Sequence, residues 1–235
     1  MDCIIERLRG LGDDKFADFQ AKLVPNVERE NIIGVRTPVL RSLAKELLND
    51  GEFCSGILPE FLNELPHRYF DENILQGEFI SKEKDFVKAI ELTRKFLPYV
   101  DNWAVCDLLA PKVFAKHKDE LFPIIRKWLE SDLIYTVRFG IDMMIKHFLD
   151  AEFKYTHLSL VNNARGDDYY IKMSKAWYFS FALIKHYEDT LAYFKNENID
   201  GWIYKKSIQK ARESYRVSDE HKDELKALLK HELCI

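Results

Sequence analysis

The sequence contains few of the residues that interrupt helices. Only 9 glycines and 7 prolines occur among its 235 residues, and no alternating strand pattern leads into an Asn-Gly or Asp-Gly turn. This scarcity argues against a turn-rich β-sandwich and a collagen-like chain.

No apolar run approaches the roughly 18 residues of a membrane span, and the first residues lack the basic start and apolar core of a signal peptide. We therefore expect no association with a membrane.

Sequence motifs for nucleotides and metals are also missing. The chain has no GxGxxG, Walker A or HExxH pattern. Its four cysteines form no CxxC pair, and no histidine stands at zinc-ligand spacing. The four cysteines are Cys3, Cys54, Cys106 and Cys234. We expect free thiols, with Cys106 in the core, and neither a metal nor a cofactor.

The charge balance is slightly acidic. The chain has 35 Lys and Arg against 39 Asp and Glu, for a net charge of −4. Such a balance is not typical of a nucleic-acid binder. Any contact with phosphate would have to come from a local basic patch.

Apolar residues recur at helical spacing along almost the whole chain. We predict helices at about residues 2–8, 14–23, 38–48, 52–62, 71–80, 83–97, 102–115, 120–130, 133–148, 153–161, 168–186, 191–196, 202–215 and 219–231. Thr37, Asp132 and Ser218 are the predicted caps of three of these helices. The connections are short, which favours antiparallel packing of neighbouring helices.

Every second helix recurs with a regular period. These helices begin near residues 38, 71, 102, 133, 168 and 202, at intervals of 31 to 35 residues. Two helices per repeat of this length indicate an α-solenoid. We therefore predict an all-α fold, a right-handed α-solenoid of antiparallel HEAT-like or ARM-like helix pairs with a concave inner face. We expect one domain over residues 1–235; a non-repeating helical bundle is the alternative.

Four residues on the predicted inner helices have side chains suited to a functional cleft. Trp103 and Asp107 lie four residues apart and therefore on one helical face. Arg138 stands in an otherwise apolar helix, and Trp177 lies near the middle of the next inner helix. Each also has a structural interpretation, as core residue, cap or ion-pair partner. Their similar positions in the repeat lead us to expect that they meet in one cleft.

Basic residues gather in the last third of the chain despite the acidic total. We predict that six of them bind DNA together with Arg138. They are Lys172, Lys175, Lys205, Lys206, Lys210 and Arg212. The alternative is a solvated outer helix face.

Five segments carry a resemblance to a known family. They are GVRTPVLRSLAKEL from Gly34, DNWAVCDLLAPKVF from Asp101, YTVRFGIDMM from Tyr135, KAWYFSFAL from Lys175 and IQKARESYRV from Ile208. In this order and spacing, the chain resembles the AlkD-type DNA alkylation repair proteins, bacterial HEAT-like DNA glycosylases. The resemblance implies release of cationic alkylated purines, such as N3-methyladenine and N7-methylguanine, from double-stranded DNA in base excision repair. It implies a monomer that acts in the bacterial cytosol or nucleoid.

The resemblance also implies roles for the four cleft residues. Asp107 would stabilise the positive charge that develops on the deoxyribose as the glycosidic bond breaks. Trp103 and Trp177 would supply electron-rich walls for a cationic base and sugar. Arg138 and the basic C-terminal helix would hold phosphates.

Two alternatives remain open. A HEAT-like module that binds damaged or branched DNA without catalysis would fit the acidic net charge. It would also fit the segment KFADFQAKLVPN, which has Phe16 and Phe19 where active relatives carry an aromatic hydroxyl. A protein-binding solenoid is the third possibility, and it predicts no DNA binding even at low salt.

Overall fold

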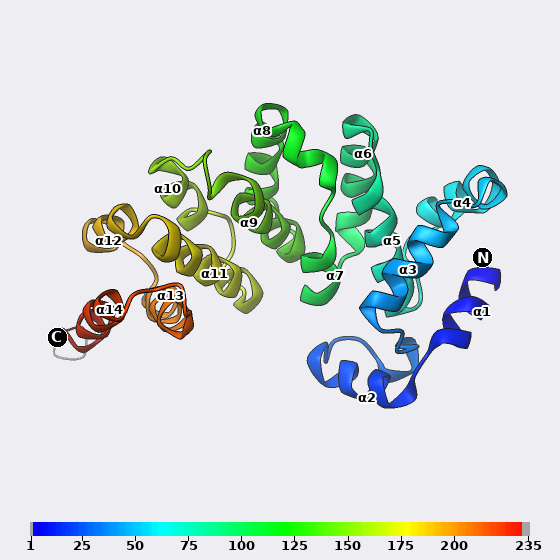
Figure 1. Cartoon of the computed structure of the whole chain (residues 1–235), viewed down its shortest axis with the longest axis horizontal. Helices are drawn as coiled ribbons and strands as arrows, with labels where there is room; N and C mark the ends of the chain where they lie inside the picture. Colours follow the sequence, from blue (N-terminus) through cyan, green and yellow to red (C-terminus); the bar gives the residue numbers. More distant parts are fainter. Residues whose placement is uncertain (1, 232–235) are drawn as a thin grey trace. The chain divides into compact units, whose positions relative to one another are not determined.

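The computed structural model describes residues 2–231, and it is helical throughout this range (Figure 1). The chain divides into two compact units, one within residues 2–117 and the other within 118–231. The prediction of one domain over residues 1–235 stays a prediction.

The N-terminal unit contains seven α-helices within residues 2–117. These are α1 (Asp2–Leu11), α2 (Asp14–Leu23), α3 (Thr37–Leu47), α4 (Leu58–Asn63), α5 (Phe70–Lys82), α6 (Phe86–Phe96) and α7 (Trp103–Leu108). Short 3₁₀ segments lie at Arg29–Asn31, Leu97–Tyr99 and Lys112–Lys116, and a π-helix spans Phe53–Ile57.

The C-terminal unit contains another seven α-helices within residues 118–231. These are α8 (Lys118–Leu129), α9 (Ile134–Phe148), α10 (Thr156–Asn162), α11 (Tyr169–Lys185), α12 (Tyr187–Asn196), α13 (Gly201–Glu213) and α14 (Asp219–His231). Predicted helices 14–23 and 219–231 agree with α2 and α14 at both ends.

The helices predicted to form the inner row pack on one another within each unit. In the N-terminal unit α5 contacts both α3 and α7, and in the C-terminal unit α11 contacts both α9 and α13. The remaining helices pack beside them, as α8 does on α9 and α12 does on α11. This successive stacking is the α-solenoid arrangement that the repeat spacing predicts. The HEAT-like subtype, the handedness and the concave face stay predictions.

The predicted helix over residues 102–115 is wrong as a single element. It consists of the short helix α7 and the 3₁₀ segment Lys112–Lys116, with a break around Pro111. Proline has no N–H to donate and disfavours helical backbone at the residue before it. That residue, Ala110, instead donates its N–H to Ser81 Oγ at 2.9 Å.

Two of the three predicted caps are also wrong. Helix α3 begins at Thr37 itself, after Arg36, and α9 begins after Leu133, and neither has a side-chain cap. Asp132 instead forms an ion pair with Arg165 at 2.7 Å. The cap of α14 is confirmed, because Ser218 Oγ accepts the N–H of His221 at 3.2 Å.

One buried carboxylate fixes the segment that enters α3. Asp71 on α5 accepts the N–H groups of Ile33, Gly34 and Val35 at 2.7, 3.3 and 2.7 Å. Its side chain lies almost completely out of solvent, and burial raises the pKa of Asp71. Asp71 therefore joins the loop between α2 and α3 to the central helix of its unit.

Cys106 is fully buried, as predicted, and Cys3 and Cys54 are free thiols. Cys234 lies outside the described residues.

No helix within residues 2–231 is long and apolar enough to cross a membrane.

Candidate functional site

Helix α7 positions Trp103 and Asp107 in the N-terminal unit. Asn102 caps the helix, because its Oδ1 accepts the N–H of Val105 at 3.0 Å. Trp103 and Asp107 then lie one turn apart, and both side chains are half-buried. The structure therefore confirms that an indole and a carboxylate share one helical face with access to solvent.

Two contacts join the start of α7 to the end of α2. The Trp103 indole Nε1–H donates to the carbonyl of Leu23 at 3.0 Å. The Asn26 amide donates to the carbonyl of Asp101 at 2.8 Å. The first of these hydrogen bonds holds the Trp103 indole against the backbone of the last residue of α2, and the second joins the segments next to it.

Helix α2 carries Phe16 and Phe19, the two phenylalanines at the place where the family resemblance predicts an aromatic hydroxyl. The ring centres of Phe16 and Phe19 lie 6.2 Å apart, and the Arg36 guanidinium carbon lies 4.6 Å from the centre of the Phe16 ring. Phe19 is 54% exposed. An apolar ring of this size in contact with water is available to a partner molecule.

Arg138 and Trp177 come together in the C-terminal unit. Arg138 on α9 is buried and donates from Nη1 to the carbonyl of Tyr170 at 2.9 Å. Its guanidinium carbon lies 6.0 Å from the centre of the Trp177 ring on α11. Trp177 itself is 38% exposed. A fixed positive charge therefore lies behind an indole that reaches solvent.

Lys210 on α13 approaches the same indole. Its Nζ lies 4.9 Å from the centre of the Trp177 ring. Partial burial lowers the pKa of Lys210, and the nearby charges of Lys206 and Arg138 lower it further. A pocket of about 270 Å³ lies here. It is lined by Trp177, Ser180, Phe181, Ile184, Lys210, Glu213 and Ser214.

The other predicted DNA-binding residues differ in how available their charges are. Lys175 is buried and donates to the carbonyls of Asn162 and Ala164 at 3.0 and 2.6 Å, and burial lowers its pKa. Lys172 forms ion pairs with Asp200 at 3.0 Å and Asp167 at 3.5 Å, which raise its pKa. Both ammonium groups thus have partners within the protein.

The remaining three basic residues lie on α13. Lys205 is exposed, and the half-buried Lys206 donates to the side chain of Gln209 at 3.0 Å. Arg212 is half-buried, and its Nε has no hydrogen-bond partner among residues 2–231. The structure therefore places Lys206 and Lys210 one turn apart on α13, with Lys210 beside Trp177, whereas Arg212 lies on another face of the same helix. Their contact with DNA stays a prediction, as does the single cleft for the four central residues.

A row of aromatic rings that the sequence pattern did not predict lies in the C-terminal unit. Ring centres are 5.7 Å apart from Tyr135 to Tyr170, 5.3 Å from Tyr170 to Tyr169, and 5.8 Å from Tyr169 to Trp202. Tyr169 and Trp202 are among the exposed large side chains. The sequence could have indicated this row, because both Tyr169 and Trp202 follow closely after an acidic residue that caps a helix.

Those caps are Asp168 and Asp200. Asp168 accepts the N–H of Tyr170 at 2.8 Å, and Asp200 accepts those of Trp202 and Ile203 at 2.9 and 3.0 Å. The ion pair between Lys172 and Asp200 lowers the pKa of Asp200 and joins α11 to α13. Tyr169, Tyr170 and Trp202 are therefore held at the N-terminal ends of α11 and α13, and Tyr135 lies at the start of α9.

No group of three or more His, Cys, Asp or Glu side chains within residues 2–231 is arranged to hold a metal ion. The predicted site residues instead supply carboxylate, indole, guanidinium and ammonium groups. These groups are suited to a substrate that combines positive charge on a ring with phosphate anions.

Comparison with known proteins agrees with this chemistry. No curated protein matches the chain. A family described as DNA alkylation repair enzyme matches residues 4–216, which is most of the chain and includes Trp103, Asp107, Arg138 and Trp177. The chain therefore belongs to the DNA alkylation repair enzyme family, and its role lies in the repair of alkylated DNA.

Proposed function

We propose that this chain is a DNA glycosylase that releases cationic alkylated purines, such as N3-methyladenine and N7-methylguanine, from duplex DNA. The observation that carries the proposal is the pair on α7, in which the Asp107 carboxylate lies one turn from the fixed Trp103 indole. Membership of the family supplies the substrate, alkylated DNA.

The reaction needs little acid catalysis from the protein. An N3- or N7-alkylated purine is already positively charged, so it leaves as a neutral base. The glycosidic bond to C1′ breaks with both electrons going to the base, and positive charge develops on the deoxyribose. A water oxygen then bonds to C1′ and releases a proton to solvent. Asp107 would stabilise the charge on the sugar and orient that water.

Trp103 and Trp177 would each stabilise positive charge through a ring face. A cation over an indole is attracted by the electron density of the ring, and the attraction increases as water is excluded. Trp177 already lies within 6.0 Å of Arg138 and 4.9 Å of Lys210, which shows that its surroundings accept cations.

The basic residues of α13 would hold the DNA backbone. Lys206 and Lys210 are the best placed because they lie one turn apart on α13 and Lys210 approaches Trp177; Arg212 would contribute from another face of this helix. Phosphate contacts of this kind position the lesion without reading sequence, and each makes binding more sensitive to salt. Lys172 and Lys175 would contribute by holding α11 against its neighbours, which positions Trp177.

The test is release of free base from duplex DNA that contains N7-methylguanine. Wild type and Asp107→Asn would be compared under single-turnover conditions, with Glu91→Gln on α6 as the matched control because Glu91 is exposed. We expect Asp107→Asn to lose about 100-fold or more in rate and Glu91→Gln to stay within about twofold. Equal rates for wild type and Asp107→Asn would overturn the mechanism.

A binding module without catalysis is the second candidate. The observation that favours it is α2, where Phe19 is exposed and no aromatic hydroxyl is present. It predicts that the wild-type protein retards alkylated duplex DNA in a salt-dependent manner and releases no base.

A further inference from the structure

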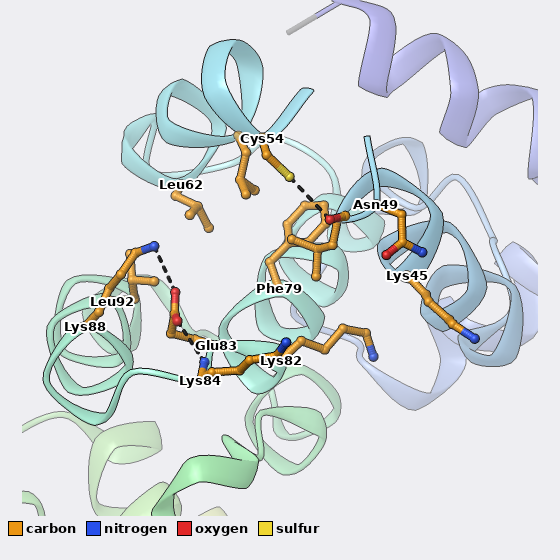
Figure 2. A pocket seen from close by; sticks show the side chains of 12 residues that line it. Lys45, Asn49, Cys54, Leu62, Phe79, Lys82, Glu83, Lys84, Lys88 and Leu92 are labelled. Carbon is orange, nitrogen blue, oxygen red and sulfur yellow. Dashed lines mark hydrogen bonds and ion pairs between the residues drawn. The ribbon is translucent and has the colours of Figure 1, made fainter. Parts of the chain in front are cut away.

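A lysine-rimmed hollow lies in the N-terminal unit. The pocket has a volume of about 600 Å³, and its lining includes no residue of the predicted site. Figure 2 shows Leu62, Phe79 and Leu92 around the hollow, and Leu48 and Leu58 add to this apolar lining. The pocket therefore has a mainly aliphatic interior.

Four lysines surround this interior: Lys45, Lys82, Lys84 and Lys88. Only one carboxylate, Glu83, lies among the lining residues, and it is already paired with Lys88 at 2.9 Å (Figure 2). Lys82 is paired with Glu78 at 3.2 Å. Lys45 and Lys84 are exposed and have no ion-pair partner among residues 2–231. The rim therefore carries an excess of positive charge on a chain whose net charge is −4.

The wall of the pocket includes an irregular helix. Cys54 belongs to the π-helix Phe53–Ile57, and its thiol contacts the carbonyls of Leu47 and Leu48 at 3.6 and 3.5 Å. Isolated π-turns occur often at functional sites. Here the turn joins the wall of the hollow to the end of α3.

We propose that this hollow binds an amphiphile made of an aliphatic chain with an anionic head group, for which a free fatty acid is the simplest example. The half-buried Leu48, Leu58 and Leu92 would receive the chain, and Lys45 and Lys84 would pair with the head group. A volume of about 600 Å³ lies within the range of roughly 300–1,000 Å³ of small-molecule sites.

The lining distinguishes this ligand from a nucleotide or a DNA strand. Asn49 is the only uncharged polar side chain besides Cys54 in the lining, and Phe79 is 4% exposed. A nucleobase would thus find neither a stacking face nor a set of hydrogen-bonding partners. A DNA backbone would contact the lysines but leave the aliphatic interior uncovered, and apolar burial is the larger source of affinity here.

The test is calorimetric titration of the full chain with decanoate, below the concentration at which decanoate forms micelles. Decanol, which lacks the charge, and butyrate, which lacks the chain, are the ligand controls. We expect saturable binding of decanoate at one site and binding of both controls weaker by about tenfold. No saturable binding, or equal affinity for decanol, would overturn the proposal.

Variants then locate the site. Lys45→Glu combined with Lys84→Glu should weaken decanoate binding about fivefold to tenfold, and Leu92→Trp should weaken it by filling the hollow. Lys15→Glu, at an exposed lysine of α2, is the matched control and should bind as wild type does. Unchanged affinity in the double variant, with its thermal unfolding unchanged, would refute the site.

A competition experiment separates this ligand from nucleic acid. Asp107→Asn should bind decanoate as wild type does, since the hollow does not depend on the proposed glycosylase activity. Short duplex DNA should not displace decanoate. Displacement by DNA, with equal loss of both ligands in the double variant, would show a nucleic-acid contact and overturn the proposal.

Discussion

The ammonium group of Lys210 lies 4.9 Å from the centre of the Trp177 ring, and the Arg138 guanidinium carbon lies 6.0 Å from the same centre. Cations within about 6 Å of an indole centre are attracted to it. Trp177 thus contacts two positive charges before DNA binds. A cationic base that took the place of Lys210 over the ring would require this ammonium group to move to a new partner, and a DNA phosphate would provide one.

Lys210→Met tests this exchange. Methionine keeps an apolar contact with the ring but removes the charge that would pair with phosphate. We expect the slope of log K against log salt for duplex binding to become shallower by about 0.9, as for one lost phosphate contact. The rate of base release at saturating protein should change by less than about threefold, because the ring face stays available.

The control for this variant is Lys127→Met on α8, an exposed lysine that lines none of the pockets described above. Its salt slope should match that of wild type. If Lys210→Met left the salt slope unchanged and lowered the rate strongly, Lys210 would act in the chemical step, and the exchange model would be wrong.

The repeat pattern predicted the fold because it depends on apolar periodicity, which the sequence displays directly. The starts near residues 71 and 168 correspond to α5 and α11, the central helices of their units. The prediction failed where local chemistry overrides periodicity. Pro111 interrupts the predicted helix at 102–115, and Thr37 lies inside α3 rather than capping it.

The sequence predicted which residue types make up the candidate site, but it did not predict the contacts that their side chains form. Spacing alone placed Trp103 and Asp107 on one face of α7. It could not show that Lys175 is buried against the carbonyls of Asn162 and Ala164, because that depends on how α10 ends. Nor could it show that Lys210 approaches Trp177, since this contact joins residues on two helices.

Asp71→Asn should destabilise the N-terminal unit. The Asp71 carboxylate accepts three backbone N–H groups, and an asparagine amide would present its own NH₂ to some of them. We expect a loss of about 2–3 kcal/mol in the free energy of unfolding, measured by urea denaturation. Glu60→Gln, at an exposed residue of α4, is the control and should change this free energy by less than about 0.5 kcal/mol. Equal stability of the two variants would contradict the role of Asp71.

Gly34→Ala should also destabilise this unit, for a different reason. Gly34 has a φ of +88°, and an added Cβ would lie 2.4 Å from the carbonyl oxygen of Asp13 and 2.8 Å from Ala17 Cβ. We expect a loss of more than about 2 kcal/mol in thermal or urea unfolding. Gly51→Ala is the matched control, since its Cβ would meet open space within a helix. That variant should be neutral or more stable by up to about 1 kcal/mol.

His147 should make the C-terminal unit sensitive to acid. Burial, together with the charges of Lys146 and Lys118, lowers the pKa of His147 from 6.5 to about 4. Between these values the unfolded chain binds a proton that the folded chain does not, so the free energy of unfolding should fall as the pH falls from 6.5 to 4. The partial exposure of this side chain limits the effect to about 1–2 kcal/mol. His147→Gln should reduce the stability difference between pH 7 and pH 4.5 by this amount. A titration of the His147 ring by NMR gives the direct check, and a midpoint near 6.5 would contradict the prediction.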